Sequence, residues 1–255
     1  MSNIPVALQM FTLRAESEKD FAGTLKNVAE LGYQGVEFAG YGNMASKELK
    51  KILDDLGLRA VSSHIPLELL ENQLEDIIHY QHSLGSTKIV CPYLPHERRT
   101  EEDYFEFISL LNSIGKTCHK EGITLCYHNH DFELLRFADG RTALETIFDE
   151  TNSEWVKAEF DVYWLTRGGE DPVEWLKRYQ DRTPLVHIKD MTTDGEQFFA
   201  ELGTGGVDLD GVLNQGKASK VEWWIVEQDQ CKRHPLESIE MSIKYLKNKF
   251  ASYTS

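Results

Sequence analysis

The fold is decided by the stretch HKEGITLCYHNHDFE, residues 119–133. A helical run ends at Gly122, a short apolar strand follows, and polar residues come directly after the strand. Glycine just beyond a helix adopts the left-handed conformation that closes it. A helix, a glycine and then a buried strand make the second half of a βαβ unit.

The same order recurs along the chain, where three further helices are predicted to end at Gly32, Gly57 and Gly85. Short β-rich runs alternate with longer runs of helical apolar spacing. The predicted strands are Val6–Thr12, Gly35–Ala39, Arg59–Ile65, Lys88–Leu94, Thr124–His130, Val156–Trp164, Leu185–Asp190 and Glu222–Gln228.

Eight such units predict a single α/β domain over residues 1–255, a (β/α)8 TIM barrel. The alternative is an open doubly wound sheet, which commonly carries a glycine-rich turn after its first strand. Here the first strand runs into MFTLRAESEKD, residues 10–20, which contains no glycine. The barrel is therefore favoured on the count of units and the chain length.

The amino-acid composition limits the kinds of partner that the protein is expected to bind. The formal net charge is −15 and the pI is about 5.0, so a nucleic acid or an anionic membrane surface is an unfavourable partner. The first residues show no signal-peptide pattern, and no apolar run is long enough for a membrane span. The four cysteines form no Cys-x-x-Cys pair and are expected to be free thiols. We expect a cytoplasmic protein, and a homo-oligomer is left open.

In a (β/α)8 barrel, the residues of the active site lie at the carboxyl ends of the strands. Asp161, His187 and Glu227 follow three consecutive strands, so their side chains should converge on the barrel axis. Two carboxylates and an imidazole suit a divalent ion such as Mn²⁺, Co²⁺ or Zn²⁺, whereas without an ion the two buried acids would repel. Each residue alone could be an ordinary hydrogen-bonded group, but three together favour a metal site.

Two further segments carry polar groups at the predicted barrel mouth. His128 and His130 have the same strand parity and should face the same way, which favours a functional role over two buried structural histidines. The run Gly203–Asp208 follows strand seven. Its glycines allow backbone N–H groups to approach a phosphate or hydroxyl, although a simple flexible turn explains them equally well.

The segments YHNHDFE, FDVYWLTRGGEDP, PLVHIKDM, ELGTGGVDLDGVL and WIVEQD occur in this order and resemble the xylose-isomerase-like TIM-barrel family of sugar isomerases and epimerases. That superfamily also includes inosose dehydratases and endonuclease IV. The resemblance covers essentially the whole chain. It is specific in the second half, and rests mainly on GVEF and SSH in the first.

The resemblance implies one divalent metal ion (Mn, Co, Zn or Mg) held by Glu, Asp, His and Glu from strands five to eight. Asp161, His187 and Glu227 match the last three positions. On strand five the family usually reads Leu-Glu, where this chain reads Leu125-Cys126. His128 is expected to supply the missing ligand, and Glu133 is its rival.

The resemblance also implies a small sugar or keto-sugar substrate, phosphorylated or not, isomerised or epimerised through an enediolate after proton abstraction beside a carbonyl. Glu227, Glu133 and His130 are the expected catalytic groups, and the expected substrate contacts are Glu37, His64 and Lys189.

The main alternative is a dehydratase or lyase acting on a keto-sugar or inosose, because the missing strand-five glutamate weakens simple two-base epimerisation. A nuclease like endonuclease IV is disfavoured by the net charge. The third alternative is a sugar-binding barrel without catalysis.

Overall fold

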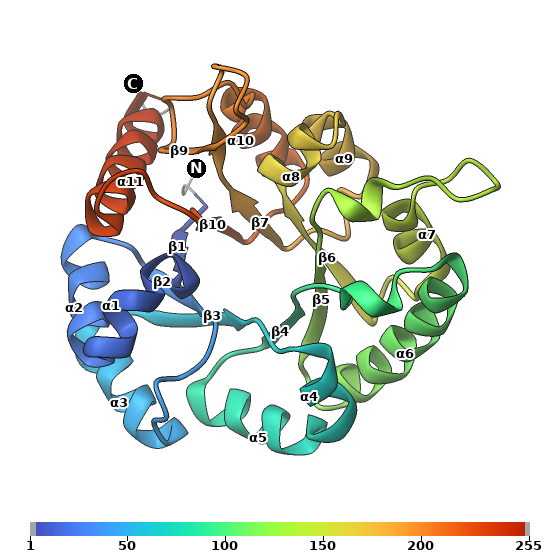
Figure 1. The fold of residues 1–255 in the computed structure, drawn as a ribbon. Coiled ribbons are helices and arrows are strands. Elements are labelled where there is room, and N and C mark those ends of the chain that lie inside the picture. The colour runs from blue at the N-terminus through green and yellow to red at the C-terminus, as the bar shows by residue number, and fades with distance from the viewer. Residues whose placement is uncertain (1–3, 253–255) are drawn as a thin grey trace.

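Eight parallel strands follow one another in the order β3-β2-β1-β10-β7-β6-β5-β4 in the computed structural model, which describes residues 4–252 (Figure 1). The ring closes between β3 and β4, where His64 bridges to Val90 and the Ile65 N–H donates to the Val90 carbonyl at 2.8 Å. The predicted (β/α)8 barrel is thereby confirmed. The strands are β1 (Val6–Gln9), β2 (Gly35–Phe38), β3 (Arg59–Ser63), β4 (Lys88–Cys91), β5 (Thr124–His128), β6 (Val156–Asp161), β7 (Leu185–Ile188) and β10 (Trp223–Val226).

Helices surround the strands on the outside of the ring (Figure 1). The α-helices are α1 (Arg14–Lys19), α2 (Phe21–Leu31), α3 (Ser46–Leu56), α4 (Leu67–Asn72), α5 (Leu74–Leu84), α6 (Glu101–Lys120), α7 (Ala143–Glu150), α8 (Val162–Arg167), α9 (Pro172–Arg178), α10 (Leu209–Ala218) and α11 (Pro235–Ser252). Three 3₁₀ turns lie in the loops, namely η1 (Met10–Leu13), η2 (His96–Arg98) and η3 (Phe132–Leu134). After β7 the short strands β8 (Asp190–Met191) and β9 (Phe199–Ala200) pair antiparallel beside the barrel. No helix within residues 4–252 has the length and apolar character needed to cross a membrane.

The four glycines predicted to close helices all have positive φ. The φ angles of Gly32, Gly57, Gly85 and Gly122 are 90°, 69°, 74° and 71°. Each of these residues would be strained with a side chain. The helix ends predicted at these four glycines are therefore confirmed.

The predicted strands were too long at their carboxyl ends. β1 stops at Gln9 because its side chain accepts the Phe11 N–H at 3.1 Å and starts η1. β6 stops at Asp161 because one carboxylate oxygen accepts the N–H groups of Tyr163 and Trp164 at 2.9 and 3.0 Å and caps α8. β5 ends at His128, so His130 lies on the loop that follows rather than on the strand.

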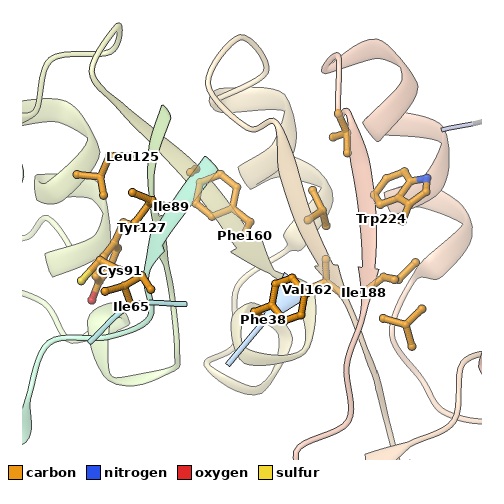
Figure 2. Close-up of a cluster of buried hydrophobic side chains, with 14 of the residues drawn as sticks. Phe38, Ile65, Ile89, Cys91, Leu125, Tyr127, Phe160, Val162, Ile188 and Trp224 are labelled. Carbon is orange, nitrogen blue, oxygen red and sulfur yellow. The ribbon is translucent and has the colours of Figure 1, made fainter. Parts of the chain in front are cut away.

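The apolar core has two parts. Outward-facing strand residues such as Phe38, Tyr127, Phe160 and Trp224 belong to the large cluster of buried apolar side chains (Figure 2). A second cluster consists of Ala7, Val61, Val90, Cys126, Leu185, Trp223 and Ile225, of which Trp223 is the most exposed at 8%. It comes from the opposite parity of the strands and fills the barrel interior. Cys126, where the resemblance led us to expect a glutamate, is part of this interior packing.

Candidate metal and substrate site

A polar layer follows the interior cluster along the strands. Two residues beyond Ala7, Cys126, Leu185 and Ile225 the chain places Gln9, His128, His187 and Glu227. All four are at most 6% exposed. Because alternate strand residues face the same way, the barrel interior changes from apolar to ionisable at this level. Buried ionisable groups therefore gather at the carboxyl ends of these strands.

Glu37 on β2 lies at the base of this layer. Its Oε1 accepts from Gln9 Nε2 at 2.8 Å and faces His187 Nε2 at 2.6 Å, and its Oε2 accepts from Ser62 at 2.5 Å. Burial opposes ionisation, but the charges of His64 and His187 hold the pKa of Glu37 well below its usual range. The sequence predicted a substrate contact here. The structure instead places Glu37 beneath the imidazoles, with both oxygens engaged.

Glu159 on β6 was not predicted as a site residue. One oxygen lies 2.7 Å from His64 Nε2, 3.1 Å from His128 Nδ1 and 3.3 Å from His187 Nε2, and the other oxygen has no partner. Burial, with the nearby charge of Glu37, raises the pKa of Glu159 to about 8. It has the same strand parity as Asp161, two residues on, and this parity is the signal that would have found it.

The predicted ligands come together above Glu159. His128, Asp161, His187 and Glu227 each offer one atom to a group whose members lie within 4.8 Å of one another. His187 Nδ1 lies 2.8 Å from Glu227, and His128 Nε2 lies 3.7 Å from Asp161 Oδ2. That Asp161 oxygen makes no aligned hydrogen bond, while its partner oxygen caps α8. The structure thus places His128 in one candidate ligand group with Asp161, His187 and Glu227.

In His128 and in His187, each of the two ring nitrogens faces a different carboxylate. His128 directs Nδ1 to Glu159 and Nε2 toward Asp161. His187 directs Nε2 to Glu37 and Nδ1 to Glu227. Metal-binding histidines are commonly oriented by a carboxylate on the nitrogen that does not bind the ion. Glu159 and Glu37 are placed to do this for an ion held on the other side.

Lys189 places an ammonium among the same carboxylates. Its Nζ lies 2.8 Å from Asp161, 2.6 Å from Glu227 and 2.7 Å from Asp229. Burial disfavours its charge, but these three acids hold the pKa of Lys189 well above its usual value. The sequence predicted a substrate contact, whereas here the ammonium is neutralised by protein carboxylates. An ion bound by Asp161 and Glu227 would leave Asp229 as its remaining partner.

These donors fit a divalent ion. Two imidazoles and two carboxylates are a common set for Zn²⁺, Mn²⁺ or Co²⁺. Burial and neighbouring charges keep the pKa of His128 well below its usual value, so this imidazole is neutral, as a ligand must be. Burial opposes the charge of His187, but Glu159, Glu37 and Glu227 hold its pKa well above the usual value, so an ion that binds there would displace a proton. A second group, made of His64, His128, Glu159 and His187, uses the opposite sides of the same two rings. Because each imidazole must keep one N–H, the two groups are alternative positions for one ion.

A cavity of about 590 Å³ opens above the ligands. His64, His128, His130 and Glu227 line it together with Asp229 and the loops that follow β1 to β4. Burial opposes the charge of His64, but Glu37 and Glu159 raise its pKa to about 10, so it carries a proton at neutral pH. His130 is predominantly neutral, since burial and the charge of Lys189 lower its pKa to about 3. Both histidines line the cavity, where a bound substrate would meet them.

Glu133, predicted as a catalytic base and rival ligand, does not line this cavity. One of its oxygens accepts from the Tyr127 hydroxyl at 2.6 Å and the other from the His130 N–H at 2.8 Å. It is fully buried and belongs to neither ligand group. Its visible role is to hold the loop that carries His130.

Glu133→Gln should reduce the pH dependence of stability. Burial raises the pKa of Glu133 to about 7, against about 4.3 in an unfolded chain, so the folded protein holds this proton more tightly. That contribution is complete below about pH 4 and is lost as the pH rises through 7. In metal-free urea unfolding, the loss of unfolding free energy between pH 5 and 7 should shrink by on the order of 2 kcal/mol in the variant.

The control makes the same chemical change at an exposed glutamate, Glu75→Gln, on α5. It should leave the wild-type pH dependence in place. An unchanged slope in Glu133→Gln would contradict the assignment.

Backbone N–H groups of the glycine-rich run Gly203–Asp208 surround the carboxylate of Asp190. Asp190 accepts the N–H groups of Gly203 and Gly205 at 2.9 Å each and that of Val207 at 3.1 Å. A Cβ on Gly205 would stand 2.2 Å from the Met191 carbonyl oxygen, so this close approach requires glycine. Of the two interpretations drawn from the sequence, the structure supports the turn, because Asp190 takes up these backbone donors.

The chain resembles known proteins in both sequence and structure. Among curated proteins, an inosose dehydratase of Clostridium beijerinckii is 26% identical, over 91% of this chain and 90% of that one. A solved protein of Parabacteroides distasonis, described as a sugar phosphate isomerase/epimerase, is 28% identical with a TM-score of 0.82, covering 96% of this chain and 94% of that one. An IolI protein solved with a zinc atom shares the fold, at 15% identity and a TM-score of 0.78, covering 98% of this chain and 99% of its own.

A match to a family profile covers most of the chain. The profile described as "Xylose isomerase-like TIM barrel" matches residues 25–249, which include every residue of the two ligand groups. The resemblance found in the sequence is confirmed at this level. The chain belongs to the xylose isomerase-like TIM-barrel family.

Proposed function

We propose that this chain is a metal-dependent lyase that removes water from a keto-sugar or keto-cyclitol, as its inosose dehydratase relatives are named to do. One observation carries the proposal. A buried group of imidazoles and carboxylates opens, through His64, His128, Glu227 and Asp229, onto a cavity of about 590 Å³. Ligand sites commonly have this size and this small set of convergent polar groups.

Dehydration beside a ketone needs a base and an acid. The base takes the proton from the carbon next to the carbonyl, and a hydroxyl on the following carbon leaves as water after receiving a proton. We assign Glu227 as the base, because it lines the cavity and is ionised: burial is outweighed by the charges of Lys189 and His187, which keep its pKa well below the usual range. We assign His64 as the acid: it lines the cavity, and because Glu37 and Glu159 hold its Nε2, the proton would come from the other ring nitrogen, Nδ1.

The remaining groups bind and orient. His128, Asp161, His187 and Glu227 would hold one divalent ion, which would supply Lewis-acid stabilisation of the negative charge on the substrate's oxygen. His130 lines the cavity and would contact the substrate there, and its ring nitrogen Nδ1 is buried without a hydrogen-bond partner. Glu133 fixes this loop from behind through the His130 N–H.

Isomerisation or epimerisation, favoured first on sequence, is the second candidate. The described function of the Parabacteroides distasonis relative supports it. It requires the same first step, but returns the proton to carbon instead of expelling a hydroxyl. Glu133 was expected to supply a second carboxylate for this return, and its oxygens are held by Tyr127 and His130. This arrangement favours the lyase.

The decisive experiment follows the mass of the product. Protein reconstituted with Mn²⁺ is incubated in D₂O with an inosose and a panel of keto-sugars, and products are analysed by mass spectrometry and NMR. Loss of one water, abolished by a chelator, supports the lyase. A product of unchanged composition with deuterium beside the carbonyl supports the isomerase or epimerase instead. Turnover unaffected by the chelator would contradict both.

A further inference from the structure

The cavity has two chemically different halves. The loops after β5 and β10 contribute ionisable groups, with His64 from the end of β3 beside them. The loops after β1 to β4 contribute an apolar wall that includes Phe11, Ile65, Pro66, Leu69, Pro92 and Tyr93. A sugar hydroxyl placed against this wall would find few partners for its hydrogen bonds. The part of a ligand that lies there must carry few polar groups.

The wall also concentrates the exposed apolar surface. Within residues 4–252 the exposed large hydrophobic side chains are Phe11, Leu69, Tyr93, Phe105 and Leu135. The first three line this cavity, with 39%, 37% and 44% of their surface exposed. Apolar surface gathered at one polar-rimmed site marks a binding region. Because it continues into the ionisable half, the same molecule can occupy both.

The cavity offers little to a phosphate group. No lysine or arginine is among its lining residues, whereas Glu227 and Asp229 are. His64, which also lines it, is already paired with the carboxylates of Glu37 and Glu159. The ammonium of Lys189 is already matched by three carboxylates. Backbone donors of the glycine-rich run are taken by Asp190, and Arg14, which lies over the Phe11 ring, lines neighbouring hollows instead.

We infer that the substrate is an uncharged keto-sugar joined to an apolar group, as in an aryl or alkyl glycoside, and not a sugar phosphate. The keto-sugar lies over His64, His128 and Glu227, and the apolar group contacts Leu69 and Tyr93. The placement of the sugar half rests on the proposed function. The preference for an apolar substituent rests on the cavity wall alone, so it can be tested without turnover.

Calorimetric binding to the Mn²⁺-reconstituted protein tests this inference. Matched methyl and phenyl glycosides of glucose, galactose, mannose and xylose are compared with the corresponding free sugars and sugar phosphates. For at least one sugar, the phenyl glycoside should bind about 10-fold or more tightly than its methyl partner, as burial of an aromatic ring predicts. The sugar phosphates should bind more weakly than either.

Substitutions in the cavity wall test whether this wall causes the preference for phenyl glycosides. Leu69→Ala and Tyr93→Ala should each reduce the preference for phenyl over methyl by about 3-fold or more. Phe105→Ala removes an equally exposed ring outside the cavity and should leave the preference unchanged.

The inference is overturned if no phenyl glycoside binds more tightly than its methyl partner, if a sugar phosphate binds most tightly, or if the two wall variants keep the full preference. A phenyl preference without dehydration of any keto-sugar would overturn the proposed reaction and leave this inference standing.

Discussion

His187→Ala should leave the purified protein nearly free of bound metal, where the wild type holds close to one divalent ion per chain. The imidazole stands at the centre of both ligand groups, with Glu227 on one nitrogen and Glu37 on the other. Its loss removes a ligand from either position. Loss of a carboxylate that only orients a ligand typically weakens metal binding roughly 10–100-fold, so loss of the ligand itself should cost more.

Elemental analysis after reconstitution and desalting measures this effect, and titration with Co²⁺ followed by its visible absorption gives the affinity. Glu159→Gln is the matched comparison, because it changes a neighbour of His128 and His187 in the same buried layer. If Glu159 only orients them, its loss should stay within roughly 10–100-fold. A loss as large as that of His187→Ala would place the ion in the lower group instead. Full metal content in His187→Ala would exclude both positions.

The barrel could be predicted because its determinants are local. Glycines at helix ends, as at Gly122, and the alternation of strand and helix periods are written in consecutive residues. The strand ends could not be placed, because they depend on caps made by single side chains. Gln9 and Asp161 have good strand neighbours, yet each turns the chain by accepting N–H groups just beyond it.

Most of the candidate ligands could be predicted from their places at the carboxyl ends of the strands. Asp161, His187 and Glu227 were expected to converge because they follow consecutive strands, and parity on strand five pointed to His128. The structure brings the four together. What parity cannot give is the register between neighbouring strands. His128 pairs with Glu159, while Asp161 pairs with His187, so one acid lies below the rings and the other above. Glu159 was missed because it stands two residues before the end of β6, although it shares the parity of Asp161.

Glu227→Gln should lower turnover, and the exchange of the substrate proton beside the carbonyl, by roughly 10²–10⁴-fold, the usual contribution of one general acid–base group. Glu227 lines the cavity and is held ionised by Lys189 and His187. The amide keeps the shape and one oxygen but cannot take a proton. Exchange is followed by NMR in D₂O with the substrate found in the keto-sugar panel.

The measurement must separate the base from the ligand, because Glu227 belongs to the proposed ligand set. Rates are therefore taken per bound ion, at Mn²⁺ concentrations that saturate the variant. Asp229→Asn is the matched control, since Asp229 also lines the cavity and contacts Lys189 but lies outside both ligand groups. It should cost less than Glu227→Gln. An exchange rate per ion within about 10-fold of the wild type in Glu227→Gln would remove this residue as the base, because a general base contributes more than that.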